Sequence, residues 1–222
     1  MMRLPTMLSV LALAACGGTN PGWGTQTLYV SARLSTNGST GGTSARVEVR
    51  EGGATGAVVT NAEVKLRGDK LESRTLAWRD QGNNGGVYVL DTFAWDTTFI
   101  LDVTRGSDTL SAALSPPGAS ILTAPIAGTT FRRADGVALK VEWKDDWGRR
   151  AENTTLSLEK AKIDQSWANG SEPYRVEFAT NRLTADKERI ELSRSNEVNL
   201  AGGSTGSTMR ATTTHRIEFT VE

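Results

Sequence analysis

The sequence predicts an all-β fold, arranged as two tandem β-sandwich domains. Three observations support this prediction. From residue 25 onward, short runs alternate between apolar and polar residues, which is the period of a half-buried strand. A 3.6-residue period, typical of a helix, is almost absent from the same stretch. The 23 glycines often lie beside Ser, Thr or Asn, and such clusters separate short strands.

Seven alternating runs form the first set of expected strands. Phe99, Leu101 and Val103 share one face of the sixth run. The tetrapeptide at 105–108, Arg-Gly-Ser-Asp, has the composition of a hairpin connection. Seven short strands within 25–115 are typical of a β-sandwich. The seven runs are 28–34, 45–50, 63–67, 73–79, 87–91, 98–105 and 109–114.

A second domain is expected at 118–222, after a boundary at 116–118. The boundary sequence is Pro-Pro-Gly, which interrupts a strand and stiffens a junction. The run from Val137 to Trp143 alternates without error and predicts a half-buried strand. The segment 158–167 fits a short helix or a hairpin limb, and both stay open. The expected strands are 120–124, 137–143, 154–158, 174–178, 188–193 and 210–222.

Two segments, 35–44 and 201–208, are rich in Gly, Ser and Thr and lie between expected strands. Such segments cannot bury apolar area, so we expect mobile, solvated loops. A binding role for either loop is the alternative.

Residues 1–15 have the order of features found in a signal peptide. Arg3 supplies a short positive region, and 8–15 is an apolar run broken only by Ser9. The run is far shorter than the roughly 20 residues of a permanent membrane helix. We therefore expect residues 1–15 to be a cleaved signal peptide. Two alternatives stay open: the segment is an ordinary secretory signal in which Cys16 stands at the cleavage site by chance, or it is a buried apolar helix and Cys16 is a free thiol.

Leu13-Ala14-Ala15-Cys16 resembles the lipobox of bacterial lipoproteins. The resemblance implies that the sulfur of Cys16 forms a thioether with diacylglycerol, that the chain is cleaved before Cys16, and that the new amino group is acylated. Palmitate is the fatty acid by which such lipidation can be labelled. Two or three acyl chains give a stable membrane anchor, whereas one chain binds only marginally. Residues 16–24 then form a flexible tether. Residue 17 is Gly, not Asp, and the lipoprotein sorting rule then implies the outer rather than the inner membrane of a bacterial cell envelope.

Short motifs in each expected domain resemble known sandwich families. Residues 60–64 (Thr-Asn-Ala-Glu-Val), Gly86-Val87-Tyr88 and the strand 99–103 resemble the carboxypeptidase regulatory-like, or transthyretin-like, β-sandwich. The strand that ends at Trp143, with Gly128 and Gly136, resembles an immunoglobulin (Ig-like) or fibronectin type III sandwich. These resemblances imply fold and not function, since many functions share such folds.

Composition excludes several classes of function. Lys plus Arg equals Asp plus Glu at 25 each, so no basic excess indicates a nucleic-acid partner. One cysteine rules out a disulfide within the chain. The single histidine, His215, argues against a histidine metal site or a Ser/His catalytic pair and is expected at a surface or strand edge. We expect no catalytic residues, no metal site, no cofactor and no enzyme activity.

Asp145, Asp146 and Trp147 follow the strand that ends at Trp143 and form the candidate ligand-contact loop. Acidic and aromatic side chains in one loop can coordinate Ca²⁺ or stack on a sugar, although calcium requires more oxygen ligands than this loop supplies. The alternative is a charged hairpin turn.

These observations favour a lipid-anchored binding, adhesion or assembly module of the cell envelope without catalytic activity. Its partners would be the membrane, through the anchor, and a protein or glycan of the envelope; its oligomeric state stays open. One alternative is an envelope enzyme, or an accessory domain, that acts on glycan. Another is a periplasmic structural partner of a secretion or transport complex.

Overall fold

The computed structural model describes residues 27–222, except 83, 84, 149 and 185. The expected signal peptide, Cys16 and the tether 16–24 lie outside the described residues. Within the described part, no helix is long and apolar enough to cross a membrane.

The prediction of an all-β fold is confirmed, because strands dominate the described residues and only short 3₁₀ helices accompany them. The strands before the expected boundary are β1 (Leu28–Asn37), β2 (Thr43–Glu51), β3 (Glu63–Gly68), β4 (Arg74–Thr75), β5 (Ala77–Asp80), β6 (Gly86–Asp91), β7 (Phe99–Arg105) and β8 (Asp108–Leu114). The later elements are β9 (Ser120–Ala124), β10 (Thr130–Phe131), η2 (Arg133–Asp135), β11 (Leu139–Asp145), β12 (Asn153–Leu158), β13 (Ile163–Ala168), β14 (Arg175–Phe178), η3 (Thr180–Arg182), β15 (Asp186–Asn199) and β16 (Thr208–Val221).

Every expected run contains a strand, but some bounds differ. The run 73–79 is divided between β4 and β5, which join different sheets. Val137 is 57% exposed and precedes β11. The buried side chains of this strand begin only at Leu139. The open segment 158–167 is a hairpin limb, since β13 pairs antiparallel with β12.

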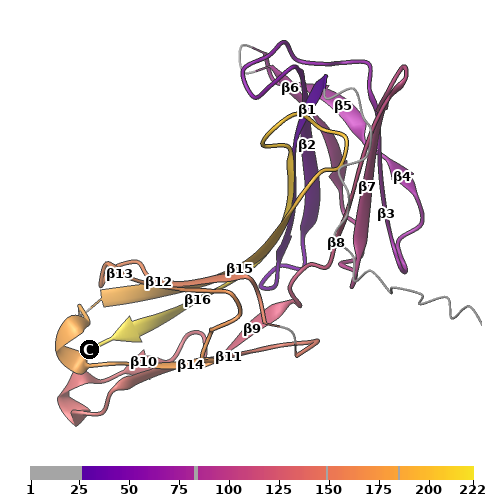
Figure 1. Ribbon diagram of the computed structural model, residues 1–222. Helices are drawn as coiled ribbons and strands as arrows, with labels where there is room; N and C mark the ends of the chain where they lie inside the picture. Colours follow the sequence, from indigo (N-terminus) through magenta and orange to yellow (C-terminus); the bar gives the residue numbers. More distant parts are fainter. Residues whose placement is uncertain (1–26, 83–84, 149, 185) are drawn as a thin grey trace, which may run out of the picture.

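Two lobes share one long sheet and meet at an angle (Figure 1). The shared sheet has the strand order β13-β12-β15-β16-β1-β2-β6-β5, and β10 also pairs with β16. In the first lobe the sheet packs against β4-β3-β7-β8, and in the second against β14-β11-β9. The shared sheet follows the inner side of the elbow between the lobes.

The long hairpin β15–β16 belongs to both lobes. Residues 208–214 of β16 pair parallel with β1, whereas 220–221 pair with β10. One face of β16 therefore serves two cores: Met209 and Ala211 lie in the first, and Ile217 lies in the second. The expected division at 116–118 stays a prediction, but residues beyond it complete the first core.

The loop 201–208 packs against the first lobe instead of extending freely into solvent. The backbone N–H of Ser204 donates to the carbonyl of Leu28, and the backbone N–H of Val30 donates to Oγ of Ser207. Ala201 also forms an isolated bridge to Ser111 on β8. These contacts fix the tip of the β15–β16 hairpin onto the first sandwich. Half of the other Gly/Ser/Thr segment, 35–44, is strand, since β1 extends to Asn37 and β2 begins at Thr43, and only 38–42 form the connection.

Tyr88 on β6 ties two parts of the first lobe together. Its hydroxyl donates to the carbonyl of Val59 at 3.0 Å and accepts from the N–H of Ala62 at 2.8 Å. Its ring packs edge-on against Trp78, with centroids 5.1 Å apart. Gly86 allows this packing, because a Cβ there would lie 2.3 Å from Cζ2 of Trp78.

We expect Tyr88→Phe to destabilise the protein by about 1–3 kcal/mol, because the buried carbonyl of Val59 loses its donor and the part-buried N–H of Ala62 loses its acceptor. Urea unfolding followed by tryptophan fluorescence measures this change. A midpoint equal to that of the wild type would show that the hydroxyl does not stabilise the lobe.

Candidate functional site

The structure separates the three residues of the expected ligand-contact loop. Asp145 ends β11 and its side chain is fully buried, whereas Asp146 is exposed and Trp147 is half-buried. The N–H of Trp147 donates to Oδ1 of Asp145 at 2.9 Å, which is the geometry of an Asx turn. The carboxylate of Asp145 is therefore turned into the protein, and the ligand-contact role of the loop stays a prediction.

Asp145 belongs to a buried polar cluster around Arg194 of β15. The guanidinium of Arg194 donates from Nη2 to Oδ2 of Asp145 at 3.0 Å and to Oε1 of Glu172 at 2.5 Å. Its Nε donates to Oε2 of Glu172 at 2.9 Å, and its Nη1 donates to Oγ of Ser120 at 3.0 Å. The hydroxyl of Tyr174 donates to Oδ2 of Asp145. Arg194 and both carboxylates are fully buried.

Against the effect of burial, hydrogen bonds and ion pairs within the cluster lower the pKa of Glu172 and raise the pKa of Arg194, so both stay ionised. Burial acts to raise the pKa of Glu172, but hydrogen bonds from Arg194 and Thr154 outweigh it and lower the pKa. Burial and the hydrogen bond to Asp145 raise the pKa of Tyr174 to about 12, so its hydroxyl stays protonated. A charged guanidinium between two carboxylates needs no external ion. The cluster therefore stabilises the fold between the two cores instead of forming an open binding site.

We expect Arg194→Met to cost about 3–5 kcal/mol of unfolding free energy, because two buried carboxylates lose their counter-ion. Arg189→Met is the matched control on the same strand, since Arg189 pairs with Glu159 and Glu218 at the surface. Exposed pairs contribute only about 0–1 kcal/mol. Urea unfolding compares the two variants, and equal losses would contradict a stabilising role for the cluster.

His215 lies on β16 between the two cores and is half-buried instead of being placed at a strand edge. Its Nδ1 accepts a hydrogen bond from the backbone N–H of Leu122 at 3.4 Å. Burial lowers the pKa of His215 below its ordinary value of 6.5. Its position indicates a structural side chain, neutral at pH 7.

The lowered pKa of His215 gives a pH-dependent stability. The unfolded chain takes up the proton near pH 6.5, before the folded chain does, so protonation favours unfolding. We expect the free energy of unfolding to fall as the pH drops from 8 through 6.5. Urea unfolding at a series of pH values measures the slope, and His215→Gln should remove this contribution. A stability that rises on acidification through this range would contradict the assignment.

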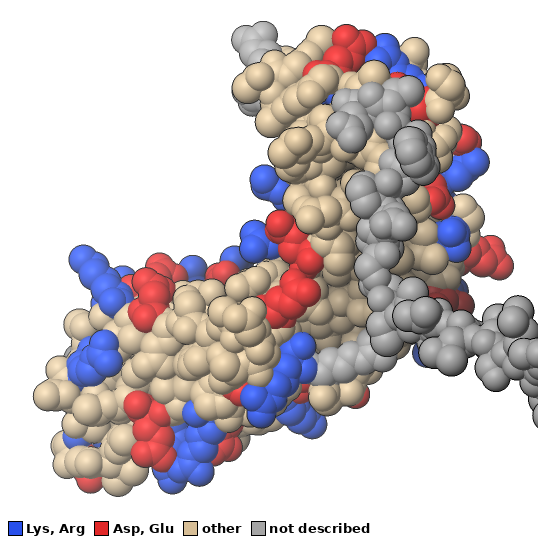
Figure 2. Space-filling model, viewed as in Figure 1, with Lys and Arg blue, Asp and Glu red and all other residues tan. Residues whose placement is uncertain are grey.

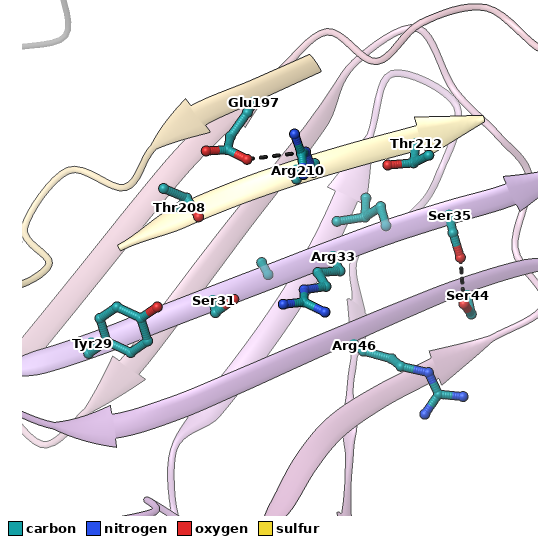
Figure 3. A pocket seen from close by; sticks show the side chains of 12 residues that line it. Tyr29, Ser31, Arg33, Ser35, Ser44, Arg46, Glu197, Thr208, Arg210 and Thr212 are labelled. Carbon is teal, nitrogen blue, oxygen red and sulfur yellow. Dashed lines mark hydrogen bonds and ion pairs between the residues drawn. The ribbon is translucent and has the colours of Figure 1, made fainter. Parts of the chain in front are cut away.

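A polar hollow lies on the solvent face of the shared sheet in the first lobe (Figure 3). Its volume is about 610 Å³, and strands β1, β2, β15 and β16 supply its lining. A second hollow continues along the same face and shares Arg210 and Thr212 with the first. Both hollows lie on the shared sheet, which follows the inner side of the elbow, and Figure 2 shows acidic and basic side chains on that side as on the rest of the visible face.

Three arginines cross the first hollow in one row. The strand register places Arg33 of β1 directly opposite Arg46 of β2 on one side and Arg210 of β16 on the other. Glu197 of β15 continues the row and pairs with Arg210, with Nε and Oε2 3.2 Å apart. Within the described residues, Arg33 and Arg46 have no ion pair or hydrogen bond through their guanidinium groups. Both side chains are exposed.

Hydroxyl and aromatic groups surround the arginine row. Tyr29 lies at one end of the first hollow, and half-buried Trp167 lines the second. Five hydroxyl side chains line the first hollow: Ser31, Ser35, Ser44, Thr208 and Thr212. Groups of this kind bind polar ligands through hydrogen bonds and stacking. In the described part of the chain, no group of three or more His, Cys, Asp and Glu side chains could hold a metal ion.

The sequence alone does not reveal this row. Each arginine occupies a polar position of an alternating strand, which is also where ordinary solvated charges lie. The register that aligns Arg210 with Arg33 joins residues far apart in the chain, since β1 and β16 are the first and last strands of the described residues. The antiparallel pairing of β1 with β2 places Arg46 beside Arg33, but only the parallel pairing of β1 with β16 shows that Arg210 is also a neighbour.

Comparison with known proteins gives no family assignment. No family model and no curated protein matches the chain. Among solved structures, 22 chains match. One is described as a Ca²⁺-stabilized adhesin that helps an Antarctic bacterium reach out and bind ice. It is 16% identical over 88% of this chain, with a TM-score of 0.28, and the chain spans 49% of its length. A TM-score of this size supports no transfer of function.

Proposed function

We propose that the chain is a lipid-anchored, non-catalytic binding module of a bacterial cell envelope, and that it binds its partner on the inner face of the elbow. The observation that carries the binding role is the arginine row, because two of its members are exposed and lack a partner among the described residues. The anchor rests on the sequence around Cys16 and on the resemblance of 13–16 to a lipobox.

The lining of the elbow supports binding without catalysis. Polar and aromatic side chains make up most of the lining of the two hollows: guanidinium, hydroxyl, amide and aromatic groups. Among the described residues that line them, the one carboxylate, Glu197, is paired with Arg210. His215 faces the opposite side of β16 from Arg210 and Thr212, so it cannot act as a base there. General acid–base catalysis needs a titrating group within hydrogen-bond reach of the substrate.

Metabolic labelling with a palmitate analogue tests the anchor. We expect label in the wild-type protein, which should remain with the membrane fraction. Cys16→Ser should take up no label, because the thioether cannot form. Equal labelling of both proteins, or a wild type without label, would contradict lipidation at Cys16.

Incubation with isolated bacterial envelope and with soluble polysaccharides tests binding without turnover. We expect the purified chain to sediment with insoluble envelope material and to release no reducing ends from any polysaccharide. Turnover that is lost in Asp146→Asn would instead establish an enzyme that acts on glycan. Failure to sediment would contradict the binding role.

A further inference from the structure

We propose that Arg33 and Arg46, with the Arg210–Glu197 pair beside them, form a subsite for the acidic groups of a polysaccharide that lies along the inner face of the elbow. This inference rests on the proposed binding function and names the chemical class of its ligand. The ligand would carry carboxylate groups on a hydroxyl-rich chain, as a polyuronate does.

The spacing of the row suits a repeating anion. Adjacent strands lie about 4.8 Å apart, so the backbone positions of the three arginines repeat at about that interval across β2, β1 and β16, and their long side chains can adjust to the ligand. An arginine offers a planar fork of donors that matches the two oxygens of a carboxylate. Glu197 engages Arg210 and leaves Arg33 and Arg46 available to a ligand (Figure 3).

The row has no evident benefit for the fold. Like charges directly opposite each other on neighbouring strands destabilise a sheet. Other exposed arginines on the same face have acidic partners: Arg189 pairs with Glu218, and Arg216 pairs with Glu191. Arg33 and Arg46 thus differ from these arginines of the same face, which form ion pairs with acidic side chains. Such differences are expected where a surface serves binding.

The surroundings favour a polysaccharide over an acidic peptide. A peptide commonly adds as a strand at a sheet edge, where backbone groups are unpaired. The row lies in the middle of the sheet, where β1 is hydrogen-bonded on both sides by β2 and β16. Only side chains face the ligand there, and they are mostly hydroxyls. Tyr29 and Trp167 offer ring faces on which sugars can stack.

Isothermal titration calorimetry with the purified full chain tests the inference. The probes are alginate oligosaccharides, which carry a carboxylate on each sugar, neutral dextran oligosaccharides, and poly-L-glutamate. We expect alginate to bind, and more weakly at high salt, because exposed charges are screened. Dextran should bind at least about tenfold more weakly, since it lacks the charge-assisted hydrogen bonds.

The variant Arg33→Gln/Arg46→Gln should weaken alginate binding by about tenfold or more. The matched control, Arg67→Gln/Arg74→Gln, removes the same charge from β3 and β4 in the opposite sheet and should bind as the wild type. Thermal unfolding gives a second readout. The first variant should unfold at the same or a higher temperature than the wild type, because it removes the repulsion between opposed arginines.

Several outcomes would overturn the inference. Alginate binding that is unchanged in Arg33→Gln/Arg46→Gln, or equal binding of dextran, would place the ligand elsewhere and leave the general binding function standing. Tighter binding of poly-L-glutamate than of alginate would assign an acidic peptide instead. A chain that binds neither the polysaccharides nor isolated envelope would contradict the proposed function together with the inference.

Discussion

The architecture depends on the hydrogen-bonded pairing of β15 with β16 over 14 residues. Side chains alternate strictly along each strand, so the inward face of the hairpin is fixed for both lobes at once. Shifting the register by one residue would expose the apolar side chains of both cores together. The hairpin therefore determines the position of the shared sheet, the angle of the elbow and the hollow on its inner side.

A strand that passes between two apolar cores crosses a buried zone whose side chains belong to neither core. Thr213 and His215 occupy this zone on β16, and Arg194 lies directly opposite Thr213 on β15. Buried charge is tolerated there because Glu172 and Asp145 surround the guanidinium. Ser120, just after the Pro-Pro-Gly junction, accepts from the same guanidinium. The cluster thus joins the hairpin to the connection between the lobes.

Local patterns predicted the strands because alternation depends only on neighbouring residues. The strand containing Leu139, Val141 and Trp143 is an example, and its three apolar side chains are buried. The sequence could not show that the first half of β16 pairs with β1. The alternation of apolar and polar residues would be the same if the whole of β16 paired only with strands of the second set. The sequence also could not show that Asp145 is turned inward, because its partner Arg194 is 49 residues away. The arginine row depends on the same long-range pairing.

The contact between β1 and the final hairpin has a consequence for the order of assembly. Val30 and Ser207, which are hydrogen-bonded, are separated by 177 residues. During synthesis from the amino terminus, β1 therefore has an unpaired edge until β16 has also been released. Contacts between such distant residues slow folding, and open strand edges promote aggregation. The first sandwich consequently cannot complete its sheet during this interval, and the edge of β1 stays open unless another protein covers it.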